Sequence, residues 1–246
     1  ELTMTIYFRD LGNYGRIGNI FFQISATIGA ARKYNDNYRF PYLNFLEKLN
    51  LPPLSIGGPI PSKISTYKEP HFHYAPIPKL SNLMNLHGYF QSELYFKHCA
   101  EEIKNALTPK YKGKFEGYTG IHVRRTDYLT HIGCYNILRR ENYYNRAMEI
   151  LSSDKYMIFS DDLEWCKSEF VGDQFHFSEE RDPVKDLGNF ISCSNHIIAN
   201  SSFSWWGAWL SPYKDKKVIA PRNWFGPKLA PTHNTKDLLP PNWIVI

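Results

Sequence analysis

The second half of the chain alternates short apolar runs with longer amphipathic runs, and this alternation restricts the fold more than any other feature. The short runs are predicted to be strands, at 118–123, 155–159, 174–177, 196–199 and 217–220. Helix-like segments lie between most of them, at 141–151, 163–170, 184–193 and 203–210. Strands that alternate with helices indicate a parallel sheet covered on both faces. Ligands bind such a sheet outside the carboxyl ends of its strands.

The beginning of the chain predicts one strand and one helix around a glycine-rich turn. The strand covers 5–8, the largely buried helix covers 20–32, and the turn contains Gly12, Gly15 and Gly18. Glycines let a backbone approach a ligand closely, and the start of the next helix attracts anions. The spacing G-x-x-G-x-x-G is neither a Rossmann fingerprint nor a P-loop, so an ordinary glycine-rich turn is the alternative.

Proline, glycine and basic residues divide the chain into two parts. The segment 42–79 is rich in proline and glycine and is predicted to be loop with short strands. A strand at 86–92 and a helix at 93–106 follow. Because 108–114 is basic, polar and broken by Pro and Gly, it is the best candidate linker. We therefore expect two domains, at 1–112 and 113–246.

Composition excludes several classes of protein. The net charge of +5 comes from 29 basic residues scattered among 24 acidic ones, so nothing favours a nucleic-acid partner. No window approaches the roughly 18 to 20 apolar residues that cross a bilayer, and residues 1–4 do not resemble a signal peptide. We expect no transmembrane segment and a cytoplasmic protein if the chain is complete. A Golgi lumenal or membrane location is the alternative if an N-terminal anchor has been removed.

Two adjacent arginines, Arg124 and Arg125, follow the predicted strand 118–123, with His122 before them and Asp127 after them. A guanidinium keeps its charge at physiological pH and holds a phosphate through paired donors. The pair therefore predicts an anion site at a strand end. The alternative is one inward arginine and one in a surface ion pair. His122 and Asp127 are candidates to orient an arginine, contact a sugar or move a proton.

A serine-rich turn precedes a helix with three tryptophans at helical spacing. The turn contains Ser201, Ser202, Phe203 and Ser204. Serines at a helix start cap the helix, but the same geometry also offers hydroxyls and backbone N–H groups to an anion. The tryptophans are predicted mainly to pack in the core.

Acidic residues near the strand ends also have two interpretations. Asp186 lies sixteen residues before Ser202. It is predicted either to accept hydrogen bonds from a purine edge or ribose, or to favour the N-terminus of its helix. Asp161 and Asp162 resemble a metal site, but adjacent acids at a strand-to-helix junction also serve as an N-cap. We expect no metal there.

Four motifs occur in order along the chain, at 15–23 (GRIGNIFFQ), 122–128 (HVRRTDY), 159–162 (FSDD) and 200–210 (NSSFSWWGAWL). Together they resemble the alpha-1,2-fucosyltransferases of glycosyltransferase family eleven. The last motif is the most specific. The first departs from the family pattern at Ile20, where a Gln is usual.

The resemblance implies a GT-B-like fold of two facing Rossmann-like domains with parallel sheets. It also implies that GDP-L-fucose is a co-substrate and that the enzyme requires neither a cofactor nor a metal ion. In related enzymes the second arginine of the H-x-R-R motif binds the donor's pyrophosphate, which maps to Arg125. We place His122 and Arg124 in the same donor site.

Further donor contacts are implied by the other motifs. The serine turn holds phosphate in related enzymes, and the acid sixteen residues earlier contacts guanine, which maps to Asp186. The glycine-rich turn faces the donor's phosphate and sugar. The residues that match these two turns are Ser201, Ser202, Phe203 and Ser204, and Gly15, Arg16, Gly18 and Asn19.

The reaction implied is transfer of L-fucose, with inversion, to O2 of a terminal β-galactoside. Arg125 would stabilise charge on the leaving phosphate, and Asp127, then His122, are the candidates for the base. The domain 1–112 is expected to carry the acceptor side and 113–246 to bind the donor. Alternatives are a GT-B enzyme with another donor or acceptor, a metal-dependent GT-A enzyme using Asp161 and Asp162, and a non-catalytic glycan-binding module.

Overall fold

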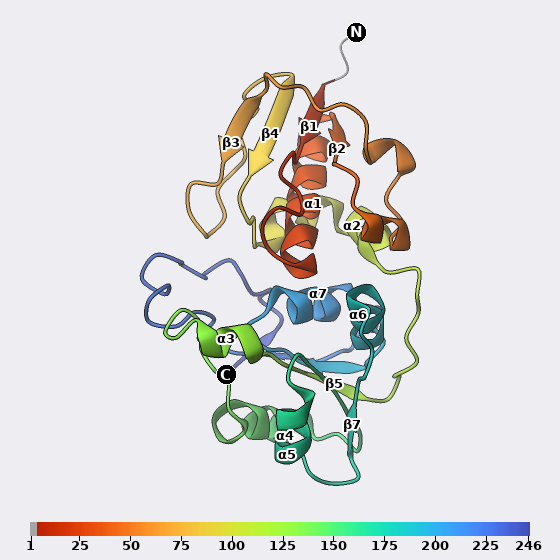
Figure 1. Cartoon of the computed structure of the whole chain (residues 1–246), viewed down its shortest axis with the longest axis vertical. Coiled ribbons are helices and arrows are strands. Elements are labelled where there is room, and N and C mark those ends of the chain that lie inside the picture. Colours follow the sequence, from red (N-terminus) through yellow and green to blue (C-terminus); the bar gives the residue numbers. More distant parts are fainter. Residues whose placement is uncertain (1–3) are drawn as a thin grey trace. The chain divides into compact units, whose positions relative to one another are not determined.

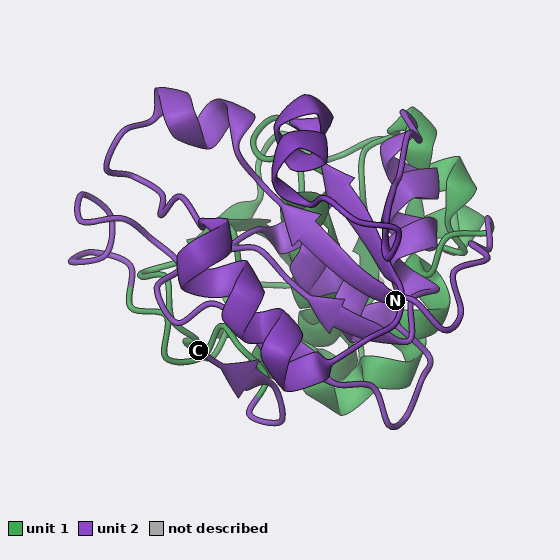
Figure 2. Cartoon of the chain, turned by 90° about the horizontal axis from the view of Figure 1, so that it is seen from below, with its two compact units in different colours: residues 1–110, 234–240 green, residues 111–233, 241–246 purple. Residues whose placement is uncertain are grey.

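The protein is an α/β protein with two separate parallel sheets (Figure 1). The computed structural model describes residues 4–246, so residues 1–3, on which the expectation about a signal peptide partly rests, lie outside the described part. The chain forms two compact units, Glu1–Lys110 with Asn234–Pro240 and Tyr111–His233 with Pro241–Ile246 (Figure 2). The predicted boundary between residues 112 and 113 did not anticipate the return of 234–240 to the first unit. There the backbone N–H of Tyr74 donates to Asp237 at 3.2 Å.

The first unit holds a four-stranded sheet in the order β2-β1-β4-β3, with every pairing parallel. Its strands are β1 (Thr5–Tyr7), β2 (Asn37–Arg39), β3 (Ser65–Lys68) and β4 (Leu83–His87), and its helices are α1 (Ile17–Tyr34) and α2 (Ala100–Leu107). Short 3-10 helices cover Asn44–Lys48, Pro53–Ser55, Glu93–Tyr95 and Lys97–Cys99. The segment 42–79 is mostly loop with one short strand, as predicted.

Two predicted elements of this unit differ from the structure. The strand expected at 86–92 is β4, which ends at His87, and the residues after it form a turn. Gly88 (φ 156°) and Phe90 (φ 53°) have positive φ, which a strand does not allow. The helix expected at 93–106 is regular only from Ala100 onwards.

The second unit holds a six-stranded parallel sheet in the order β10-β9-β8-β5-β6-β7. Its strands are β5 (Thr119–Val123), β6 (Tyr156–Ser160), β7 (Phe175–Phe177), β8 (Asn195–Ile197), β9 (Val218–Ala220) and β10 (Ile244–Val245). Its helices are α3 (Thr126–Thr130), α4 (Asn145–Leu151), α5 (Leu163–Glu169), α6 (Pro183–Ile191) and α7 (Ser202–Leu210), with a π-helical turn at Arg140–Tyr144. α4 and α5 lie on one face of the sheet, and α6 and α7 lie on the other (Figure 1).

The sheet order of the second unit identifies its topology. Numbered from the first strand of the unit, β7-β6-β5-β8-β9-β10 is the order 3-2-1-4-5-6 of a Rossmann fold. A core of buried apolar residues fills the face under α4 and α5. It includes Ile121, Val123, Tyr144, Ile158, Phe170, Ile197 and Ile219. The predicted parallel α/β architecture is confirmed, whereas α3 and β10 were not predicted.

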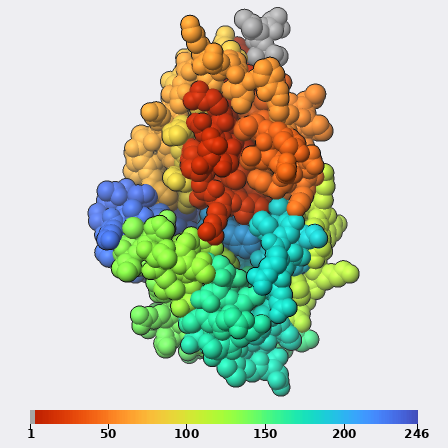
Figure 3. All heavy atoms as spheres, in the orientation of Figure 1, coloured from red at the N-terminus to blue at the C-terminus, as the bar shows by residue number. Residues whose placement is uncertain are grey.

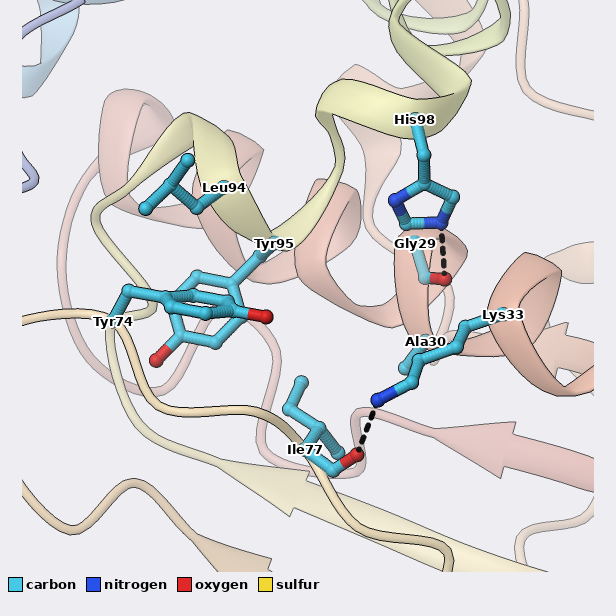
Figure 4. A pocket seen from close by; sticks show the side chains of 8 residues that line it. All are labelled: Gly29, Ala30, Lys33, Tyr74, Ile77, Leu94, Tyr95 and His98. Atoms are coloured by element: carbon cyan, nitrogen blue, oxygen red, sulfur yellow. Dashed lines mark hydrogen bonds between the residues drawn. The ribbon is translucent and has the colours of Figure 1, made fainter.

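The helix α1 is buried along most of its length, and at Gly29 it packs directly against the backbone of Tyr95. A Cβ at Gly29 would lie 2.1 Å from the Tyr95 carbonyl oxygen, and His98 Nε2 donates to the Gly29 carbonyl at 3.0 Å. Gly29, Tyr95 and His98 line a hollow of about 130 Å³. Figure 4 shows these residues. The helix therefore needs a residue without a side chain at this position.

We expect Gly29→Ala to destabilise the protein by about 2 kcal/mol, because overpacking outweighs the better helix propensity of alanine. Thermal unfolding would show a fall in Tm of about 4–8 °C. Gly57→Ala is the matched control, since its Cβ meets nothing within 4 Å and only its positive φ of 76° opposes alanine. Its cost should be about 1 kcal/mol. A Gly29→Ala protein as stable as the wild type would contradict the packing argument.

Candidate functional site

The strand order of the second unit reverses between β5 and β8. From β5 the chain first builds outward to β6 and β7 and then returns to place β8 on the other side of β5. In open α/β sheets the crevice outside the carboxyl ends at such a switch point is where ligands bind. Arg124 and Arg125 directly follow β5, and the serine turn follows β8. The two predicted anion-binding motifs therefore occupy the two sides of this switch point.

Arg124 is held by two carboxylates. Its Nη2 lies 2.7 Å from Asp127 Oδ1 and its Nη1 lies 3.0 Å from Asp161 Oδ2, while the side chain is 13% exposed. The guanidinium also lies over the ring of Tyr128, 5.7 Å from its centroid. Two carboxylates compensate the charge of Arg124, so this arginine is suited to holding the loop in place and less suited to binding an anion.

Arg125 is held from one side. Its Nε donates to Asp162 Oδ2 at 3.1 Å, and its guanidinium stacks on Trp165, 3.8 Å from the ring centroid. In residues 4–246 the terminal nitrogens Nη1 and Nη2 have no hydrogen-bond partner. A guanidinium that is fixed through Nε and its face presents paired donors in a fixed direction. Arg125 is therefore the better placed of the two arginines to bind an oxyanion.

Asp161 and Asp162 hold the turn that carries these arginines. Asp161 accepts hydrogen bonds from the backbone N–H of Arg125 at 2.9 Å and of Thr126 at 3.2 Å. Burial alone would raise the pKa of Asp161, but the Thr126 hydroxyl and the charge of Arg124 outweigh it and hold the pKa below its ordinary value. Asp162 also caps α5, because it accepts from the Trp165 N–H at 3.3 Å. The N-cap interpretation of this acidic pair is confirmed for Asp162.

The cluster contains two guanidinium groups and three carboxylates. The acids fix the arginines but reduce the net positive charge. An anion bound here needs further donors, which backbone N–H groups at a helix start can supply.

The start of α7 offers such donors. Ser201 is its N-cap residue, and its side chain makes no capping hydrogen bond, so the prediction that the serines cap the helix is wrong for Ser201. Ser202 and Phe203 are partly exposed at the first turn. Behind them the helix is anchored by buried tryptophans, as predicted: Trp205, Trp206 and Trp209.

His122 and Ser204 join the two sides of the switch point. His122 Nδ1 and the Ser204 hydroxyl share a hydrogen bond of 2.9 Å, and the imidazole packs against Phe203. Burial and the charge of Arg124 lower the pKa of His122 to about 3. A buried imidazole with so low a pKa stays neutral and accepts a proton only weakly near pH 7. Its geometry supports the position of Ser204.

Asp186 lies in the first turn of α6, apart from the arginine cluster. Its Oδ1 accepts a hydrogen bond from the Ser178 hydroxyl at 2.6 Å. Burial raises the pKa of Asp186 to about 6, the Ser178 hydroxyl opposes this, and the charge of Glu180 adds to it. Asp182 is the N-cap of α6 and accepts from the Val184 N–H at 2.9 Å. Since another residue already caps this helix, Asp186 is available for a different role.

The remaining predicted residues, Gly15, Arg16, Gly18 and Asn19, belong to the first unit. Gly12 to Arg16 is an exposed turn, part of the red segment at the surface of that unit in Figure 3. Gly15 has φ 82°, and a Cβ there would lie 2.5 Å from the Asn19 side chain. Asn19 Oδ1 accepts from Gln91 Nε2 at 2.9 Å. The structure thus connects the glycine turn to the turn that follows β4.

Direct contacts divide the predicted residues of the second unit into two groups. One contains Arg124, Arg125 and Asp127 with Asp161 and Asp162, and the other contains His122, Phe203 and Ser204. The sequence prediction missed Trp165 and Ser178 and did not recognise the two acids as partners of the arginines. The signal was available in the acids, because Val123 and Ser160 pair in register and the residues after them must meet.

The described residues contain neither a metal-binding cluster nor a membrane-spanning helix. Among residues 4–246 no group of three or more His, Cys, Asp or Glu side chains is arranged to hold a metal ion. Within the same residues no helix is both long and apolar enough to span a bilayer. The hollow in Figure 4 is lined by none of the predicted site residues.

Comparison with known proteins shows the chain to be similar to glycosyltransferases. A family model described as glycosyl transferase family 11 matches residues 63–246. An O-antigen biosynthesis glycosyltransferase of Escherichia coli, WbnK, is 34% identical over 114 residues, which are 42% of this chain and 38% of the relative. An alpha-1,2-colitosyltransferase of Escherichia coli is 33% identical over 155 residues, or 54% of this chain and 53% of the relative.

An animal protein is also similar. The galactoside alpha-(1,2)-fucosyltransferase 1 of Homo sapiens is 27% identical over 135 residues, which are 46% of this chain and 35% of that protein. The matched regions thus span about half or less of the length of these relatives. Two of the three carry an α-1,2 linkage in their names.

Proposed function

Because the chain belongs to glycosyl transferase family 11, we propose that it transfers L-fucose from GDP-β-L-fucose to O2 of a terminal β-galactoside, with inversion at the anomeric carbon. The family makes the protein a glycosyltransferase. The donor, the acceptor and the roles of the residues below are parts of the proposal.

The observation that carries the proposal is the pairing of Arg125 with the start of α7 across the switch point of the second sheet. In the proposed complex the two terminal nitrogens of Arg125 and the N–H groups at Ser202 and Phe203 bind the pyrophosphate. As the bond from fucose C1 to the β-phosphate oxygen breaks, negative charge grows on that oxygen. Donors fixed in advance stabilise such charge without reorganising.

We propose that these donors act without a metal ion. A divalent cation in a nucleotide-sugar site neutralises the leaving phosphates, and fixed arginine and backbone donors supply the same stabilisation. Asp161 and Asp162 are engaged by the arginines and by the cap of α5, so their oxygens are already used for positioning. This arrangement favours a metal-independent enzyme over a GT-A enzyme that binds a cation through these acids.

Asp186 is proposed to select the guanine base. An ionised carboxylate accepts two hydrogen bonds, and the guanine edge presents two neighbouring donors, N1–H and N2–H. An adenine edge presents a donor and an acceptor and leaves one carboxylate oxygen unpaired. Asp186 would thus distinguish GDP-sugars from ADP-sugars.

GDP-colitose should be tested as a second donor, because one relative is named a colitosyltransferase. Colitose is L-fucose without its 3-hydroxyl group. If the site hydrogen-bonds that hydroxyl, GDP-colitose should be a much poorer donor, since the site's polar groups would remain unpaired. If the site does not contact it, both sugars should be transferred.

The test is a panel of donors and acceptors. We expect transfer from GDP-fucose to a β-galactoside such as lactose, an α-1,2 linkage in the product by NMR, and undiminished turnover in excess EDTA. GDP-colitose, GDP-mannose and UDP-galactose are the alternative donors. Transfer from another donor alone would reject the fucose assignment, and activity lost in EDTA would reject metal independence. Glycan binding without transfer or donor hydrolysis would favour a non-catalytic module.

A further inference from the structure

A hollow in the first unit lies between α1 and the segments on either side of β4. Its volume is about 130 Å³. A cavity of about 150 Å³ can hold benzene, so the hollow suits a ligand whose body is about that size. Its walls come from one unit only, and they include Ala30 and Lys33 of α1, Tyr74 and Ile77 before β4, and Leu94 and Tyr95 after it.

Contacts between these segments hold the walls of the hollow in place. His98 Nε2 donates to the Gly29 carbonyl at 3.0 Å. The Tyr95 hydroxyl accepts from the Ala75 N–H at 3.1 Å, and the rings of Tyr74 and Tyr95 pack with their centroids 4.8 Å apart. The hollow is therefore preformed, and a ligand does not have to order it on binding.

The ammonium of Lys33 lines the hollow and forms no ion pair within residues 4–246. Its Nζ lies 3.4 Å from the Ile77 carbonyl oxygen, which is long for a hydrogen bond. The Tyr34 hydroxyl already donates to the same carbonyl at 2.6 Å. Among the described residues that line the hollow, none is acidic. An uncompensated ammonium in this position favours an anionic ligand.

Neighbouring basic residues are paired, in contrast to Lys33. Arg32 lies 2.6 Å from Glu102, measured from Nη2 to Oε1. Lys79 Nζ lies 3.0 Å from Asp36 Oδ1. These two acids are thus engaged by other cations, and the charge of Lys33 is available to a ligand.

The Tyr74 hydroxyl is a second polar group suited to the same anion. It makes no hydrogen bond within the described residues. In Figure 4 this hydroxyl lies on the side of the ring toward Lys33 and Ala30. A hydroxyl donates to a carboxylate oxygen, and a hydrogen bond to an ionised group is stronger than one between neutral groups.

The rest of the wall is apolar. Ile77 is buried, whereas Leu94 is 42% exposed at the rim, and the ring of Tyr95 lies between the two segments. Inorganic phosphate would leave these apolar surfaces uncovered and would exchange its hydration for few donors. A carboxylate with an apolar body uses the charged and the apolar parts of the hollow together.

We propose that this hollow is a binding site for a small organic carboxylate. The carboxylate pairs with the Lys33 ammonium and accepts a hydrogen bond from the Tyr74 hydroxyl. The apolar body of the ligand packs against Tyr95, Leu94 and Ile77. None of the predicted donor-site residues lines the hollow, so this site is additional to the proposed transfer reaction.

The experiment titrates the whole chain with benzoate at constant ionic strength and follows binding by saturation-transfer NMR. We expect a Kd on the order of 1 mM. Benzamide has the same size without the charge and should bind about tenfold more weakly or worse. Inorganic phosphate, added as a competitor at the concentration of benzoate, should not displace it.

Two variants test the residues. Lys33→Met removes the charge and keeps an apolar chain, so benzoate should bind about tenfold more weakly while benzamide binds as before. Tyr74→Phe removes the hydroxyl and should weaken benzoate about tenfold. The matched control is Lys104→Met, which removes a lysine of α2 that pairs with Glu101, and it should leave both affinities unchanged.

Each contrary result has a definite meaning. Equal affinity for benzoate and benzamide, or a Lys33→Met protein that binds benzoate like the wild type, would overturn the anion site. Displacement of benzoate by equimolar phosphate would overturn the preference for a carboxylate. Absence of benzoate binding at about 20 mM would overturn the site itself. If Tyr74→Phe does not fold, Lys33→Met decides, because its side chain is exposed. None of these results depends on whether the chain transfers fucose.

Discussion

Replacing Arg125 with alanine is expected to lower kcat for fucosyl transfer by about 10²–10³-fold, because the leaving phosphate loses a preorganised pair of donors. Binding of GDP-fucose should weaken less than turnover, since the charge on the phosphate oxygen grows as the bond breaks. The fold should persist, because Asp162 keeps its hydrogen bond to the Trp165 N–H. Steady-state kinetics at saturating substrates and thermal unfolding measure both effects.

Graded variants sharpen this test. Arg125→Lys keeps the charge but loses the paired donors and the stacking on Trp165, so its rate should lie between wild type and alanine. Asp162→Asn, which removes the ionic partner of Nε at 3.1 Å, should also be intermediate. Arg146→Ala, at an exposed position on α4, serves as the control. An Arg125→Ala enzyme with a kcat within threefold of the wild type would refute the phosphate assignment.

GDP binding is expected to weaken about tenfold for each pH unit below about 6, the pKa of Asp186. The guanine edge requires the ionised carboxylate, so below this pKa binding must release a proton. Above it the affinity should be constant. Titration calorimetry between pH 4.5 and 8 measures the slope. His122, whose pKa is about 3, does not titrate in this pH range, so it does not contribute to the pH dependence attributed to Asp186.

Asp186→Asn should remove this pH dependence and weaken GDP by about 100-fold, because an amide offers one acceptor and one donor to an edge with two donors. The same amide complements adenine, so the ratio of GDP to ADP affinity should fall further. Asp182→Asn retains an N-cap oxygen for the Val184 N–H and is the matched control on α6. Unchanged guanine preference in Asp186→Asn would exclude the proposed contact.

The alternation of strands and helices could be read from the sequence, because apolar periodicity is a local property. The order of the strands could not, since a run of apolar residues does not say which neighbour it will pair with. The switch point between β5 and β8, which gives Arg125 and α7 their common position, depends on that order. Motif resemblance selected the same residues without supplying the geometry.

Where prediction failed, the cause was a contact between residues distant in sequence. The expected strand 86–92 contains residues that favour extension, yet Glu69, which directly follows β3, fixes the Tyr89 and Phe90 N–H groups in a turn. The predicted bases illustrate the same point. The local sequence shows that His122 and Asp127 are side chains that can transfer protons. It does not show that burial makes His122 a weak base or that Asp127 pairs with Arg124.

All pairings between the named strands of the described residues are parallel, and this has a consequence for folding kinetics. Parallel neighbours cannot be joined by a two-residue hairpin, so each sheet forms only after long loops have closed. Even β3 and β4, which follow one another in the chain, pair Ser65 with Met84. Chains dominated by such non-local pairing fold slowly and expose unpaired edges while they do so. Yield of active enzyme on refolding should therefore depend strongly on protein concentration.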